Sequence, residues 1–246
     1  MNSTVELLTS DKHDEYEDLL RSVEHSLIYA SLPFRRFLSS LLSESESRYL
    51  CASREGKVVG ALPAFLHRNR ELGNVLNSLP FFGSNGGVIA SPEVDDPESV
   101  KRDLIDAFHC LGEEESVVTS TIIANPLDPE PDFYDRFSEA TLNDERIGQI
   151  TPLPELLPEE TLADRLLQSF HTMPRRAIRK GQKSGLEVER TDSQSAFDAL
   201  AELHRANMEA IGGRVKSARV FKLLRSEFSH PEDYTLYVAR LEGQVI

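Results

Sequence analysis

Apolar residues recur along the chain with strand and helix periods. TVELLTS at residues 4–10 is typical of a strand, and residues 11–30 repeat apolar positions three and four apart, which predicts a helix. Pro33 is expected to begin a second helix, and Asp96 with Pro97 to cap and begin another. The β-branched run at 116–126 predicts a buried strand.

A hairpin pattern occurs twice. YLCASREGKVVG at 49–60 and YTLYVARLEGQVI at 234–246 each place a Glu-Gly pair between apolar runs. A shift of 187 positions (243 minus 56) brings Gly56 onto Gly243, and glycine can adopt the positive φ of a tight turn. Two amphipathic segments precede each copy, so the repeat is larger than a hairpin.

The order of elements indicates two related domains with a mixed sheet. Residues 1–152 run β, α, α, β, β, β, α, β, α, β, ending on a strand at 146–153. A Pro- and Glu-rich linker and a basic helix, interrupted near Pro174, occupy 153–185. The order then restarts over 186–246 and stops at the beginning of a strand. We therefore predict an α/β fold (α+β, mixed sheet) whose second domain is incomplete.

Composition excludes some classes of partner. With 41 acidic and 27 basic residues the net charge is −14, which argues against general binding of DNA or of anionic membranes. No signal peptide or membrane span is predicted, which favours the cytoplasm. Cys51 and Cys110 are expected to be buried and unlinked. The seven histidines show no metal-ligand spacing, so no metal site is predicted.

The element order resembles the GNAT acyltransferase fold, twice over. Together with MPRRAIRKGQKSGLEVE at 173–189 it resembles the FemAB family of peptidoglycan-bridge aminoacyltransferases and related N-acyltransferases. The resemblance implies transfer of an acyl group from acyl-CoA or aminoacyl-tRNA to an amine of a cell-envelope or polysaccharide precursor. The acceptor would be a sugar or peptide linked to a nucleotide or a lipid, and tRNA would be a further partner.

The segment RRAIRKGQK carries five positive charges in nine residues. At helical spacing Arg175, Arg179 and Lys183 share one face. Such a face can bind the diphosphate of a nucleotide- or lipid-linked precursor, or a tRNA backbone. The alternative is a solvated face that balances neighbouring acids.

The glycine-rich stretch FFGSNGGVIAS at 81–91 is a second candidate. Its backbone can approach a ligand closely, and we take Asn85 and Gly86 as candidate binding residues. The FemAB resemblance implies that this turn lines the acceptor cleft. The alternative is a β-bulge without a ligand. The stretch matches poorly the basic, glycine-containing loop that binds the pyrophosphate of acyl-CoA in GNAT domains.

A third candidate follows the first helix of the second domain, in HRANMEAIGGRVK. The GNAT resemblance implies that this loop borders the acceptor pocket, which makes His204, Asn207, Arg214 and Lys216 candidates to orient the substrate. The alternative is that the histidine is structural. No nucleophile motif is present, which fits direct attack by an amine and leaves the catalytic residues unassigned.

Two rival functions remain open. One is a non-catalytic, degenerate GNAT module that binds a glycan, a peptide or a nucleotide-linked ligand. The other is an RNA-binding adaptor that uses the basic helix, although the segment lacks aromatic residues interleaved with its bases.

Overall fold

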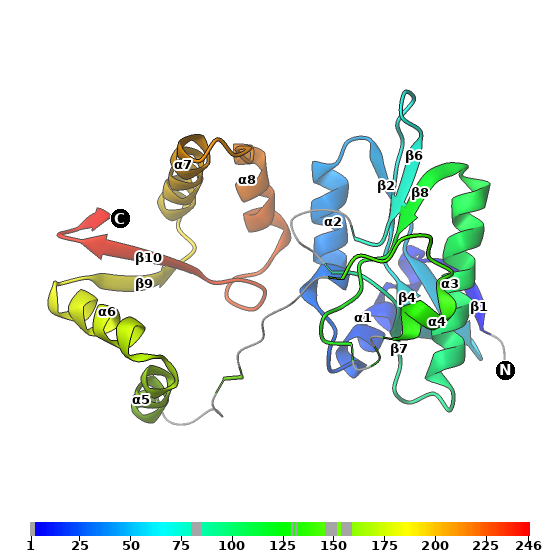
Figure 1. The fold of residues 1–246 in the computed structure, drawn as a ribbon, viewed down its shortest axis with the longest axis horizontal. Coiled ribbons are helices and arrows are strands. Elements are labelled where there is room, and N and C mark those ends of the chain that lie inside the picture. The colour runs from blue at the N-terminus through cyan, green and yellow to red at the C-terminus, as the bar shows by residue number, and fades with distance from the viewer. Residues whose placement is uncertain (1–2, 80–84, 129, 131, 146–151, 154–158) are drawn as a thin grey trace. The chain divides into compact units, whose positions relative to one another are not determined.

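The computed structural model describes residues 3–79, 85–128, 130, 132–145, 152–153 and 159–246 (Figure 1). The chain divides into two compact units. The first comprises Met1–Asp144 with Ser226–Phe228, and the second comprises Glu145–Arg225 with Ser229–Ile246. The strand predicted at 146–153 and most of the linker after it lie outside the described residues.

The first unit mixes strands and helices, as predicted. Its strands are β1 (Thr4–Leu7), β2 (Ser45–Ser47), β3 (Leu50–Arg54), β4 (Lys57–Leu62), β5 (Phe65–His67), β6 (Asn74–Asn77), β7 (Ile89–Ala90) and β8 (Val117–Thr121). Its helices are α1 (His13–Ser22), α2 (Leu32–Leu41), α3 (Pro97–Glu114) and α4 (Phe133–Phe137), with short 3-10 turns at Ser10–Lys12 and Ile28–Ala30.

Both arms of the first hairpin change partners part-way along their length. Near the turn, β3 and β4 form a sheet of order β1-β3-β4-β7; farther away, the same arms continue as β2 and β5 in a sheet of order β2-β5-β6-β8. Pro63 separates β4 from β5 and lacks the N–H that a continuous ladder would use. All pairings in these sheets are antiparallel except β6 with β8, so the second sheet is mixed.

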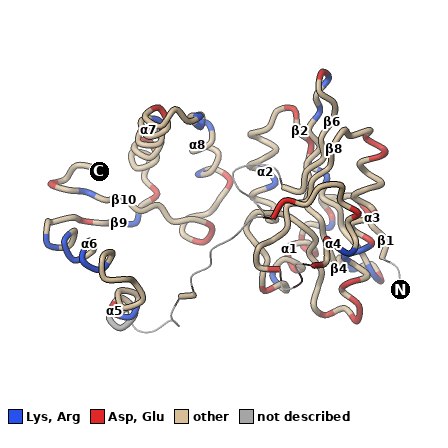
Figure 2. The backbone as a smooth tube through the Cα atoms, viewed as in Figure 1, with Lys and Arg blue, Asp and Glu red and all other residues tan. Residues whose placement is uncertain are grey.

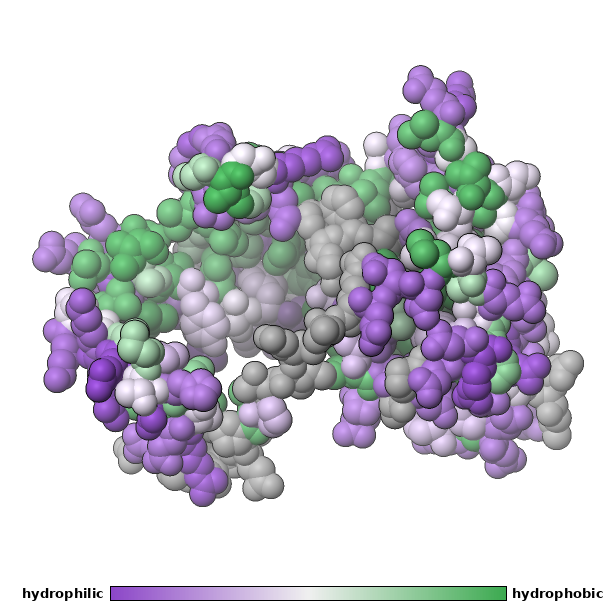
Figure 3. Space-filling model, in the orientation of Figure 1, coloured by the Kyte–Doolittle hydropathy of each residue, from purple (hydrophilic) through white to green (hydrophobic). Residues whose placement is uncertain are grey.

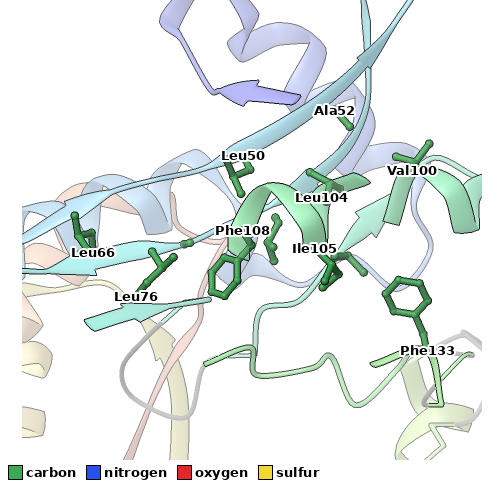
Figure 4. Close-up of a cluster of buried hydrophobic side chains, with 12 residues drawn as sticks. Leu50, Ala52, Leu66, Leu76, Val100, Leu104, Ile105, Phe108 and Phe133 are labelled. Carbon is green, nitrogen blue, oxygen red and sulfur yellow. The ribbon is translucent and has the colours of Figure 1, made fainter. Parts of the chain in front are cut away.

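Helix α3 covers the core of the first unit. Leu104 and Phe108 of α3 pack with Leu50 and Leu76 of the strands in one buried cluster (Figure 4). The helix lies so close to β4 that a Cβ on Gly60 would sit 2.4 Å from Val100 Cγ1. Each such buried side chain contributes about 1.5–3 kcal/mol to stability.

The sequence predicted two helix starts correctly and the extent of one helix wrongly. The Asp96 carboxylate accepts a hydrogen bond from Ser99 N at 3.0 Å, so this residue caps α3 as predicted. The single helix predicted over 11–30 is wrong: α1 ends at Ser22, and the chain returns through a 3-10 turn. There the Tyr16 hydroxyl donates to Ala30 O at 2.6 Å, a contact that a continuous helix would not allow. Helix α2 begins at Leu32, with Pro33 in its first turn.

The strand expected to be buried at 116–126 is short and mostly exposed. It forms β8, which pairs with β6 and leaves most of its side chains in contact with water. The expectation for the cysteines also needs one correction: both are unlinked, but only Cys51 is buried and Cys110 is exposed.

The cysteines should differ in reactivity. Burial raises the pKa of the Cys51 thiol to about 12, and the thiolate is the reactive form. At pH 8 we expect iodoacetamide to alkylate Cys110 of the native chain at least about tenfold faster than Cys51. Peptide mass spectrometry measures both rates, and in urea they should converge. Equal rates in the native chain would contradict the burial of Cys51.

In the second unit, two helices come first along the chain, and elements in the order β, α, α, β, β follow them. Its elements are α5 (Glu159–Ser169), α6 (Thr172–Lys183), β9 (Glu187–Thr191), α7 (Gln194–Ala210), α8 (Ala218–Glu227), β10 (Leu236–Leu241) and β11 (Gln244–Val245). The predicted interruption of the helix falls at residues 170–171, so that Pro174 lies in the first turn of α6, where its missing N–H costs little.

The two hairpins have the same turn. Glu55 and Gly56 have φ of 50° and 81°, and Glu242 and Gly243 have φ of 51° and 79°. Positive φ at both central residues is the I′ turn that matches the twist of two-residue hairpins. Strand order is also alike, since β9, β10 and β11 pair in the order that β1, β3 and β4 show.

One face of the sheet in the second unit carries exposed apolar residues. Val188 pairs with Ala239, and Arg190 with Tyr237, so these four residues share a face. Val188 is 61% and Tyr237 62% exposed. Figure 3 shows hydrophobic residues at the surface of this unit, beside the hydrophilic surface of α5 and α6. The shift of 187 positions aligns Ala239 with Ala52. Because Ala239 pairs with Val188 and Ala52 pairs with Val5, Val188 corresponds to Val5. In the first unit, α3 covers this face of the sheet.

Candidate functional site

The parallel strands β6 and β8 end side by side, and their ends are joined by hydrogen bonds. Ser78 N donates to Thr121 O at 2.8 Å, and Ile123 N donates to the Ser78 hydroxyl at 2.8 Å. Ser78 is fully buried. Its side chain thus replaces a backbone acceptor at the point where the two strands would otherwise separate.

The candidate residues Asn85 and Gly86 lie beside the ends of these two strands. Gly86 N donates to Ile123 O at 2.8 Å, and the Asn85 amide donates to Ala124 O at 3.2 Å. A Cβ on Gly86 would lie 3.0 Å from Ser78 O, so any other residue would press against the end of β6 at this close approach. The segment therefore fills the space beside the end of β8. Residues 80–84, which belong to the same glycine-rich stretch, lie outside the described residues.

Tyr134 of α4 holds the next part of this segment. Its hydroxyl accepts a hydrogen bond from Val88 N at 2.9 Å, and burial raises the pKa of Tyr134. Gly87 has a φ of +106°, and a Cβ there would sit 2.4 Å from the hydroxyl oxygen. Sequence reasoning missed both Ser78 and Tyr134, because neither belongs to a motif and both act across long sequence separations.

The N-terminus of α3 is acidic. Asp96 caps it, Glu98 of the first turn pairs with Arg136 at 3.1 Å, and Glu93 and Asp95 precede the cap. The nearest base on the helix, Lys101, pairs with Glu130 at 2.7 Å and lowers the pKa of that carboxyl. Carboxylates already occupy the positive end of the helix dipole, so this helix start is unsuited to a pyrophosphate.

Helix α6 contains the candidate bases Arg175, Arg179 and Lys183. Figure 2 shows several basic positions in blue along this helix. Arg179 and Lys183 are exposed and Arg175 is half-buried. Within the described part of the chain, none of these three, nor Arg176 or Lys180, forms an ion pair. The alternative that the run balances neighbouring acids therefore finds no support among the described contacts.

The opposite side of α6 is apolar and also open to water. Met173 is 74% and Ile178 38% exposed, and no described residue of this helix is buried. The helix ends at Lys183. Gly185, just past its end, has a φ of +79°, and Leu186 N donates back to Gly181 O at 3.3 Å. This termination confirms Gly185 as the predicted stop.

The remaining candidates gather at the end of α7. Lys216 N donates to His204 Nε2 at 3.1 Å, which fixes the loop after α7 to the helix. The imidazole also meets the Phe221 ring edge-on, with centroids 5.6 Å apart. Asn207 lies one turn after His204 on α7 and is exposed, as is Arg214 in the loop.

The described residues were searched for clusters of metal ligands and for helices that could span a membrane. No group of three or more His, Cys, Asp or Glu side chains could bind a metal ion among the described residues. No helix in the described part of the chain is long and apolar enough to cross a bilayer.

Comparisons with known proteins identify the fold. No protein-family model and no curated protein matches the chain. The crystal structure of FemX matches 97% of this chain with a TM-score of 0.69 at 16% sequence identity. This chain has the FemX fold. It spans 58% of the FemX chain, and the predicted likeness to the FemAB family is confirmed at the level of the fold.

Two acetyltransferase structures match a smaller part of this chain. An aminoglycoside acetyltransferase from an uncultured soil metagenomic sample, in complex with trehalose, covers 62% of this chain and 97% of its own, with 16% identity and a TM-score of 0.43. A ribosomal-protein-alanine N-acetyltransferase from Brucella melitensis biovar Abortus 2308 covers 60% of this chain and 99% of its own, with 18% identity and a TM-score of 0.39.

Proposed function

We propose that this protein is an N-acyltransferase or aminoacyltransferase that modifies an amine of a cell-envelope or polysaccharide precursor. The FemX fold and the tandem order of elements support the class of reaction. The acceptor would be a sugar or peptide carried on a nucleotide or lipid diphosphate. The reaction would take place in the cytoplasm, where acyl-CoA and aminoacyl-tRNA are made.

The choice of acceptor rests on the bases of α6, which form no ion pair with any described residue. Arg175, Arg179 and Lys183 lie on one helical face without a described ion pair, in a chain whose net charge is −14. Two guanidinium groups and an ammonium at this spacing suit the oxygens of a diphosphate. Cations that pair with no described residue of an acidic chain favour a separate anion as their partner.

The donor would be the thioester of acyl-CoA, with aminoacyl-tRNA as the alternative. The amine nitrogen attacks the acyl carbon, the bond to sulfur or to the ribose oxygen breaks, and the amine loses its proton to solvent. Catalysis would rest on orientation and on stabilisation of the oxyanion. The acidic start of α3 disfavours the first unit as the place where the donor pyrophosphate binds.

A non-catalytic binding module is the second candidate function. The Asn85–Gly87 segment occupies the space beside the ends of β6 and β8, and the N-terminus of α3 is lined by carboxylates. Both observations favour a first unit that binds without catalysing. A glycan, a peptide or a nucleotide-linked ligand would suit this role.

A transfer assay separates the two functions. The chain is incubated with UDP-glucosamine, which carries a free amine on a nucleotide diphosphate, and with radiolabelled acetyl-CoA or aminoacyl-tRNA. We expect label on the amino sugar from one of these donors. Binding of UDP-glucosamine without transfer, measured by calorimetry, would favour the binding module, and neither binding nor transfer would contradict this choice of acceptor.

A further inference from the structure

Helix α6 sorts its residues onto two opposite sides. Successive residues of an α-helix turn by about 100° around its axis, so residues four apart lie on the same side. The five bases of α6 share one side, and among the described helices of ten or more residues α6 separates polar from apolar residues most sharply. The opposite side consists of apolar and small residues, namely Met173, Pro174, Ala177, Ile178 and Gly181.

The apolar side of α6 is largely exposed to water. An amphipathic helix of a globular protein normally buries this side in a core. Helices α7 and α8 do so through Phe197 and Val220, but no described residue of α6 is buried. Phe170, which directly precedes the N-cap residue His171, is also 45% exposed. An apolar surface therefore lies beside the charged surface of the same helix.

The bases of α6 lie in the part of the chain that is close to neutral. Residues 159–246 contain 14 basic and 13 acidic residues, so the excess of acidic residues lies within residues 1–158. The net charge of −14 therefore argues against anionic partners for residues 1–158 and not for α6. The five bases form no ion pair with a described residue, which leaves their charges open to an anion outside the chain.

A helix with a basic side and an exposed apolar side suits the surface of an anionic bilayer. The apolar residues enter the boundary between head groups and acyl chains, and the bases are attracted to the negative lipids. RNA or a soluble diphosphate would use the bases but would leave Met173 and Ile178 in water. The exposed apolar side is thus the observation that favours a lipid surface.

The order of residues around the axis gives the bases separate roles. Lys180 lies next to Met173, and Arg175 lies on the side of Ile178, so both flank the apolar side and can extend to the head groups. Arg179 and Lys183 lie opposite the apolar side and face away from a membrane on which the helix rests. They stay available to a soluble diphosphate while the helix is bound.

We propose that α6 is a membrane-surface helix that docks this protein on an anionic lipid bilayer. This inference goes beyond the proposed function and does not rest on it, because it requires neither a donor nor an acceptor. The helix lies along the surface and does not cross the bilayer. Its affinity depends both on the apolar area that it buries and on the charge of the lipid.

Sedimentation with vesicles tests the role of charge. We expect the chain to partition at least about tenfold better onto vesicles of phosphatidylcholine and phosphatidylglycerol in equal parts than onto phosphatidylcholine alone. Lys180→Gln should lower this partition about fivefold, because one flanking charge is lost. Lys222→Gln, at an exposed lysine of α8, is the matched control and should change the partition less than about twofold.

Substitutions on the apolar side test insertion. Met173→Ser should lower the partition about fivefold or more, whereas Met173→Leu should keep it within about twofold of the native chain. Leu203→Ser, at an exposed apolar position of α7, is the control and should have no effect. The melting temperature should stay the same in all three variants, because these side chains are exposed.

A single tryptophan distinguishes a membrane from RNA, because the native chain contains none. In Met173→Trp we expect fluorescence to shift to shorter wavelength with the mixed vesicles and to stay unchanged with poly(U) RNA. Absence of partition of the native chain onto the mixed vesicles would overturn the proposal. Equal partition of Met173→Ser and the native chain would also overturn it, since the apolar side would then play no part. Binding of poly(U) without any shift on vesicles would assign the helix to RNA instead.

Discussion

Amide hydrogens of β9 and β10 will exchange with deuterium at least about 100-fold faster than those of β3 and β4, a difference of ~2.8 kcal/mol in opening free energy. Among the described residues, the buried hydrophobic side chains of the second unit are only Ala196, Phe197, Val220 and Val238. The first unit has a cluster of 12 such residues closed by α3. Opening free energy follows the apolar contacts that an element loses when it opens.

Exchange measured by mass spectrometry on residues 1–246 provides the comparison. A matched pair of substitutions tests its cause, because Leu50 and Tyr237 occupy equivalent hairpin positions (237 minus 50 is 187). Leu50 is 5% exposed, and its replacement by alanine should cost the first unit about 2–4 kcal/mol of unfolding free energy. Tyr237→Ala should cost less than about 1 kcal/mol. Equal protection of the two hairpins, or equal costs, would contradict this account.

Arg179→Gln will weaken binding of UDP-glucosamine by at least about tenfold, or ~1.4 kcal/mol, and leave the melting temperature unchanged. Arg179 is exposed on α6 and has no described ion pair, so its guanidinium is available to an anion. Folding should not depend on it, because the side chain makes no described contact that glutamine would lose. Isothermal calorimetry and thermal unfolding measure the two effects on the same preparations.

Arg205→Gln is the matched control for this substitution. Arg205 is also an exposed helical arginine of the second unit, but it is held by Glu202 and by Glu209 on α7. Its loss should leave affinity unchanged. A lower melting temperature with native affinity in Arg179→Gln would remove the basic helix from the binding site. Equal affinity losses in both variants would mean that net charge, and not this helix, attracts the ligand.

Features set by a few neighbouring residues could be predicted from the sequence. The two Glu-Gly turns, the Asp96 cap of α3 and the stop of α6 before Gly185 all formed as expected. In each case the determining interaction spans no more than about five residues, so the conformational preference of the local segment decides the outcome. The exposure of Arg179 and Lys183 on α6 was also open to prediction, because five charges in one short helix are costly to bury.

Features that depend on distant partners could not be predicted. The division of the hairpin arms between two sheets, the end of α1 at Ser22 and the exposure of β8 follow from pairings between separate segments. The same holds for Asn85 and Gly86, which meet Ile123 and Ala124 across almost forty residues, and for the acceptor role of His204 toward Lys216. Residue types and spacings encode which groups can form a hydrogen bond. Which of the many possible partners they meet depends on how the chain packs, because only burial of the intervening elements brings these particular groups within reach.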